Sequence, residues 1–187
     1  MTVLKMIAPK FIASILLAMF SVSFTTAQPP ASREYQIKAI FLFNFTQFIE
    51  WPAAAFANPG SPLVIGILGE NPFGSYLHDA ITGEKVNGHP LIIQRFSSIS
   101  QIQPCHILFI NQTETNKFGQ LETILKGQSV LTVSDAPDFM KRGGMVRFFT
   151  KSNKTQLQIN LESIKAANLV VSSKLLRLAE IFEPNKK

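Results

Sequence analysis

The chain has 187 residues, a formal net charge of +6 and one cysteine. This length is sufficient for one domain with a substantial core, and a lone cysteine excludes an intramolecular disulfide. The basic excess includes no lysine-arginine run and no basic stripe interleaved with aromatic residues, so nucleic-acid binding is not expected. The three histidines are scattered without metal-ligand spacing, and no metal site is predicted.

The first residues have the pattern of an export signal. Two lysines precede an uncharged apolar run at residues 11–24, and small residues follow it. This is the three-part pattern of a secretory signal peptide with cleavage after Ala27. The run is shorter than the roughly 20 residues of a membrane-spanning helix, which favours cleavage over anchoring. We expect a signal peptide at residues 1–27 and an exported mature domain at residues 28–187, carrying a charge of +4 because two lysines leave.

Residues 34–52 are predicted to form an unusually apolar helix. Leu42 and Phe43 widen its apolar stripe until it nearly encircles the helix, so the helix must be covered on most sides. Pro52 ends it. The stripe comprises Ile37, Ile40, Phe41, Phe45, Phe48 and Ile49.

Beyond an irregular link, apolar runs alternate with helical segments. Strands are predicted at residues 63–68, 90–96, 105–110 and 129–134. Helices are predicted at residues 73–81, 116–125 and 137–142, with a short helical turn at 97–102. Strands and helices that alternate over these distances form βαβ units, hence a mostly parallel sheet.

The pattern changes after Gly144. Residues 145–149 and 156–160, joined by residues 150–155, are predicted to form an antiparallel hairpin at a sheet edge, and the second strand alternates polar and apolar residues. The chain then ends in predicted helices at residues 161–168 and 172–182. The expected fold is α/β, a single domain whose mostly parallel sheet has helices on both faces and an antiparallel edge hairpin.

Two loops at strand ends contain candidate ligand-binding residues. Gly69 and Asn71 follow the first strand, and Ser134 and Asp135 end the fourth. Glycines allow close approach of a phosphate, but the loop fits neither dinucleotide-binding nor Walker spacing, and Glu70 would repel a phosphate. A structural turn is therefore the preferred interpretation, while ligand binding at the carboxyl ends of the strands stays open on fold grounds.

Asp135 fits two roles. Its carboxylate could orient a ligand, or it could cap the next helix. Asp before Ala136-Pro137 is a favourable helix start, so capping is the preferred role.

Catalytic signatures are missing from the sequence. Ser172, Ser173 and Lys174 do not have SxxK spacing, and a cap for the last helix explains the serines better. There is no GxSxG elbow. The sequence predicts no catalytic residues, no cofactor and no enzyme activity.

Cys105 is the one candidate redox residue. It opens the apolar run at residues 105–110, where a buried, inert thiol is the preferred interpretation over a redox role. An intermolecular disulfide remains open.

Several segments, in their order and spacing, resemble the YfiR-like family of bacterial periplasmic proteins over residues 33–182. They are the aromatic helix ending at residues 48–52, residues 64–73, 105–109, 130–135 and 143–145, Ile159-Asn160, and residues 172–176.

The resemblance implies a role. The best-known member is a soluble periplasmic repressor that binds the periplasmic sensor region of a membrane-anchored diguanylate cyclase, lowering cyclic di-GMP and biofilm formation. The family also implies homodimers and an outer-membrane lipoprotein as a sequestering partner. It offers no catalytic residues. That member uses disulfides for redox control, whereas Cys105 has no partner cysteine here, so intramolecular redox switching is not expected.

Two alternatives stay open. The loops at Gly69 and Asp135 motivate a periplasmic small-molecule-binding subunit of another signalling system, such as a sensor kinase. The second alternative is an exported hydrolase, and only the isolated serines and histidines favour it.

Overall fold

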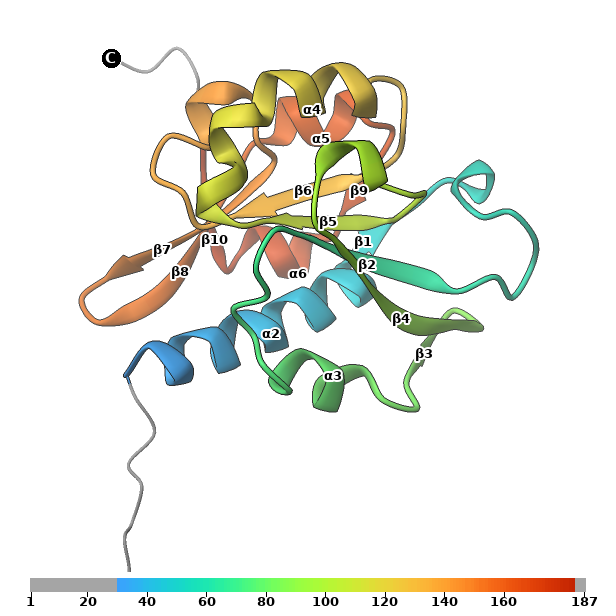
Figure 1. The fold of residues 1–187 in the computed structure, drawn as a ribbon, viewed down its shortest axis with the longest axis horizontal. Helices are drawn as coiled ribbons and strands as arrows, with labels where there is room; N and C mark the ends of the chain where they lie inside the picture. The colour runs from blue at the N-terminus through green and yellow to red at the C-terminus, as the bar shows by residue number, and fades with distance from the viewer. Residues whose placement is uncertain (1–29, 184–187) are drawn as a thin grey trace, which may run out of the picture.

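The computed structural model describes residues 30–183 (Figure 1). One sheet contains eight strands in the order β10-β8-β7-β6-β5-β2-β4-β3. Its strands are β2 (Leu63–Leu68), β3 (Lys85–Val86), β4 (His89–Phe96), β5 (Ile107–Ile110), β6 (Leu131–Ser134), β7 (Val146–Lys151), β8 (Lys154–Ile159) and β10 (Ala179–Ile181). A separate ladder pairs β1 (Ile49–Glu50) antiparallel with β9 (Val170–Val171).

Within residues 30–183, five α-helices and four short 3-10 helices precede or connect these strands. The α-helices are α2 (Pro30–Phe48), α3 (Tyr76–Ile81), α4 (Phe118–Leu125), α5 (Leu161–Ala166) and α6 (Ser173–Leu176). The 3-10 helices are η1 (Ala53–Ala55), η2 (Ile99–Gln101), η3 (Gln112–Lys117) and η4 (Met140–Arg142). Within residues 30–183, no helix has the length and apolar character needed to cross a membrane.

The sheet is mostly parallel, which confirms the predicted α/β class. From β4 through β2, β5 and β6 to β7, all neighbours run parallel. Parallel strands covered on both faces are continuously apolar, and all six residues of β2 are buried. Figure 1 shows α2 and α3 on one face of the sheet and α4 on the other.

Each face of the sheet has its own core. Ile65 and Ile67 of β2 join a cluster with Leu42 and Phe45 of α2. Their neighbours Val64 and Leu68 point to the opposite face, where a second cluster includes Phe118, Leu121 and Phe139. Successive strand residues point to opposite faces, so one run of six apolar residues serves both cores.

The buried face of α2 differs from the predicted stripe. Ala39, Leu42 and Phe45 are fully buried at a spacing of three residues, and Ile49, which begins β1, continues the same buried row at 3% exposure. The prediction that Ile37 and Ile40 belong to the buried stripe is wrong, because they are 40% and 50% exposed. The helix is rotated so that Lys38, rather than either isoleucine, is buried.

The last predicted helix is also corrected. Only Ser173–Leu176 is helical, and Ala179–Ile181 forms β10, which pairs parallel with β8. Phe182 N donates to the Ile159 carbonyl at 2.8 Å, which holds the chain to the sheet beyond β10. The edge of β8 has unpaired main-chain groups that bind residues 179–181. The spacing of apolar residues in the sequence gives no information about this distant strand, so it predicted a helix instead.

The hairpin of β7 and β8 is confirmed as antiparallel, with Ser152 and Asn153 at positive φ in its two-residue turn. It is not at the edge of the sheet, because β10 lies outside β8. The predicted helix at residues 137–142 is reduced to a turn and η4.

Candidate functional site

The carboxyl ends of the parallel strands bring the predicted loops to one edge of the sheet. Gly69 has a φ of +87°, and its N–H donates to the Phe96 carbonyl. A Cβ placed on Gly69 would lie 2.9 Å from Glu114 and 3.2 Å from Asn111. The Asn111 amide also donates to the Glu70 carbonyl at 3.0 Å. The glycine therefore allows the loops after β2 and β5 to pack together, as a structural turn requires.

Asn71 shapes its own loop. Its side-chain oxygen accepts from Phe73 N at 3.0 Å, and its amide donates to the Gly74 carbonyl at 3.4 Å. The first bond is an Asx turn. Asn71 also lines a cavity of about 320 Å³ together with His78 and Arg95. Of the four candidate ligand residues, Asn71 is the one found on the lining of this cavity.

Ser134 is fully buried and satisfied by main-chain groups. Its hydroxyl donates to the Ile110 carbonyl at 2.7 Å and accepts from Ala136 N at 3.2 Å. These bonds tie the end of β5 to the turn after β6. The Ser134 hydroxyl therefore has a structural role at the carboxyl ends of β5 and β6, and it is not exposed to solvent.

Asp135 is the centre of a buried charged cluster. Lys38 Nζ lies 2.6 Å from Asp135 Oδ2, and each side chain is only 4% exposed. Tyr35 donates its hydroxyl to the same oxygen at 2.8 Å. The Lys38 ammonium also contacts Glu34 at 2.7 Å and lies 4.3 Å from the Tyr35 ring centroid. Burying a carboxylate is costly unless it is paired, so this cluster explains how Asp135 remains inside.

The remaining carboxylate oxygen, Asp135 Oδ1, is buried and has no hydrogen-bond partner in the described part of the chain. Burial and then the neighbouring Asp135 carboxylate raise the pKa of Tyr35 above its usual range, so this hydroxyl stays protonated and donating.

The preferred capping role for Asp135 is wrong. Its carboxylate accepts hydrogen bonds from Lys38 and Tyr35 of α2, and the Ser134 hydroxyl accepts from Ala136 N instead.

The structure connects the two predicted loops only indirectly. Tyr35 packs edge-on against Phe73 in the first loop, with ring centroids 5.7 Å apart, and binds Asp135 in the second. Sequence reasoning missed both Tyr35 and Lys38. The available signal was that Lys38 is the one charged residue between Glu34 and Glu50, and that it lies four residues after Glu34.

Cys105 is 7% exposed and packs in the second core. Burial raises the pKa of its thiol to about 12. Since the thiolate is the reactive form, this environment supports the interpretation of Cys105 as an inert core residue. In residues 30–183, no three His, Cys, Asp or Glu residues gather as a metal ion would require.

His106, beside Cys105, is a buried acceptor. Its Nδ1 accepts from Val64 N at 3.1 Å, and Phe56 stacks on its ring with centroids 4.4 Å apart. Phe56 also stacks on His89 at 3.8 Å. Burial, with a smaller contribution from His89, lowers the pKa of His106 to about 4. A proton on Nδ1 would remove the acceptor for Val64.

This pKa predicts acid sensitivity. Because the unfolded histidine has a pKa near 6.5, the unfolded state binds more protons than the folded state between pH 6.5 and about 4. The contribution of His106 to stability is complete above pH 6.5 and falls by about 2–3 kcal/mol as the pH drops to 4. An NMR titration of the three histidine rings checks this. A His106 midpoint near 6.5 would contradict the prediction.

The comparison with known families agrees with the resemblance in the sequence. The model of the YfiR/HmsC-like family matches residues 35–180, which includes both loops, the Lys38–Asp135 pair and nearly all of the sheet. A comparison with curated proteins finds no match. The matched segment covers well over half of the chain, and the protein therefore belongs to the YfiR/HmsC-like family.

Proposed function

We propose that this protein is exported to the periplasm, where it binds the periplasmic sensor region of an inner-membrane diguanylate cyclase and represses it. The observation that carries the proposal is the family match over residues 35–180. The signal-peptide pattern of residues 1–27 supports the periplasmic location. Lower cyclic di-GMP and less biofilm are the expected consequences in the cell.

Repression has a physical requirement. The repressor can shift the cyclase only by binding its inactive state more tightly than its active state. A change from mostly active to mostly inactive cyclase needs a preference of about 10⁴-fold. Family membership also supports a homodimer and sequestration by an outer-membrane lipoprotein, and we include both in the proposal.

Deletion of the gene tests the proposal in the cell. Cellular cyclic di-GMP should rise, and the full chain should restore it. A copy that begins at Gln28 should not restore the cyclic di-GMP level, because without residues 1–27 it stays in the cytoplasm and cannot reach the periplasmic sensor region. An unchanged level, with the protein verified in the periplasm, would contradict repression of a cyclase and favour the alternative of a ligand-binding subunit of another signalling system.

Direct binding separates the two outcomes further. The purified mature protein is tested for capture of each periplasmic sensor region of its host, cyclases and kinases in parallel. Retention of a cyclase region supports the proposal, and retention of a kinase region alone would replace it.

A further inference from the structure

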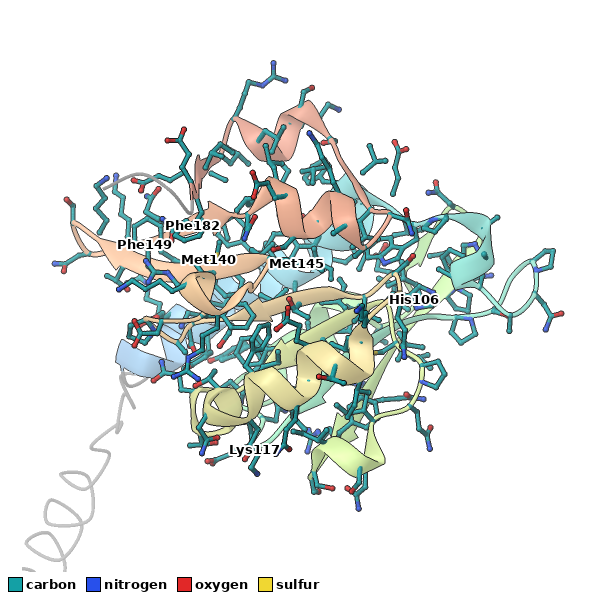
Figure 2. The ribbon with its side chains drawn as sticks, turned by 90° about the horizontal axis from the view of Figure 1, so that it is seen from above. His106, Lys117, Met140, Met145, Phe149 and Phe182 are labelled. Carbon is teal, nitrogen blue, oxygen red and sulfur yellow. The ribbon has the colours of Figure 1, made fainter. Side chains whose placement is uncertain are left out.

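A cleft of about 460 Å³ opens between α4 and α5, and its lining includes none of the four predicted ligand residues. Thr132 of β6 and Met145, just before β7, form part of its lining, together with Phe118, Val130 and Ala167. Figure 2 looks onto this region and shows Met145 between the two helices. The volume is within the range of small-molecule sites.

One carboxylate is directed over the cleft. Glu122 and Lys126 lie one helical turn apart on α4, a spacing that favours an ion pair, yet neither takes part in an ion pair within residues 30–183. A Cβ built on Gly143 would lie 4.0 Å from Glu122 Oε1 and 4.0 Å from the Phe118 ring. The carboxylate thus reaches across the cleft toward Gly143, beside an aromatic edge.

The buried part of the lining is apolar except for the hydroxyl of Thr132, and half-buried Ser163 adds a second hydroxyl. Phe118 and Val130 are buried and Met145 is half-buried. Thr132 is 4% exposed, and its Oγ1 accepts from Met145 N at 3.3 Å, which leaves the hydroxyl proton available to a ligand acceptor. Few polar groups over an apolar floor are typical of a small-molecule site.

The charge at the opening favours a cation. The cleft includes residues 125–127, where α4 ends, and a helix C-terminus has partial negative charge. Lys126, at the C-cap of α4, is placed where its cation complements the same carbonyls. Glu122 and this helix terminus together carry more negative charge than the Lys126 ammonium offsets, and Glu122 is the lining carboxylate that can pair with a ligand cation.

We propose that the cleft between α4 and α5 binds a small organic amine, with its ammonium group at Glu122 and its apolar body against Phe118, Val130 and Met145. The proposal goes beyond repression of a cyclase and does not depend on it. Because Glu122 is at the exposed rim, its charge contributes modestly, and the apolar floor supplies most of the affinity.

Two probes of nearly equal shape isolate the charge. 2-Phenylethylamine and neutral 2-phenylethanol are titrated into the mature protein, and amide shifts are followed by NMR. Both should perturb α4, α5 and Met145, and the amine should bind about three- to tenfold more tightly. Equal affinities, shifts elsewhere, or no saturable binding at millimolar concentration would each overturn the proposal.

Three variants complete the test. Glu122→Gln should abolish the preference for the amine while leaving the alcohol affinity unchanged. Ala166→Trp, at an exposed position on the lining, should weaken both probes by filling the cleft. Glu84→Gln, also exposed but outside the lining, is the matched control and should change neither. A preference that survives in the Glu122→Gln variant would overturn the assignment of this carboxylate.

Discussion

Replacing Lys38 by methionine is expected to lower the free energy of unfolding by about 3–5 kcal/mol, because it leaves the Asp135 carboxylate buried without its cation. Methionine retains most of the chain length of lysine, so the change removes charge more than volume. Lys38 and Asp135 are each 4% exposed, and Asp135 Oδ1 already lacks a partner in the described residues. Tyr35 alone would remain to bind the carboxylate.

Urea denaturation at pH 7 measures this effect, with Lys141→Met as the matched control. Lys141 and Asp138 are 3.7 Å apart, but both side chains are mostly exposed, so the control should leave the unfolding midpoint almost unchanged. Adding Asp135→Asn to Lys38→Met should restore part of the loss, because the unpaired charge is gone. A Lys38→Met protein as stable as the control would show that the buried pair does not hold α2 on the sheet.

Phe45→Ala is expected to cost about 3–5 kcal/mol through the cavity it leaves. Phe45 is fully buried between α2 and the sheet and stacks on Phe148 of β7, with ring centroids 6.0 Å apart. The surrounding strands are held by their hydrogen bonds and cannot close the space fully. Loss of this ring weakens the contact that fixes α2.

Ile40→Ala on the same helix is the control for Phe45→Ala. Ile40 is 50% exposed, and alanine has the higher helix propensity, so the two effects nearly cancel. Both variants are compared with the unchanged protein by urea denaturation. A large loss with Ile40→Ala would support the stripe predicted from sequence and contradict the observed rotation of α2.

The sequence predicted only part of the candidate site. The positions of Ser134 and Asp135 at the carboxyl end of a parallel strand followed from the βαβ pattern, which is local. Their partners were not readable: Lys38 is 97 residues from Asp135, and no periodicity connects them. The cleft between α4 and α5 also combines segments distant in sequence, so neither Glu122 nor Thr132 stood out as a lining residue.

By itself the sequence determined the α/β class, the hairpin of β7 and β8 and the family, since strand period, helix period and turn residues act over a few positions. Tertiary structure alone decided which face of α2 is buried and that residues 179–181 form a strand. It also decided what neutralises Asp135. Each of these depends on a contact with a distant part of the chain. Phe45 of α2 packs on the face of the sheet, and β10 pairs with the edge of β8. Lys38 pairs with the buried carboxylate of Asp135. Burial and pairing free energies exceed local propensity where the two compete.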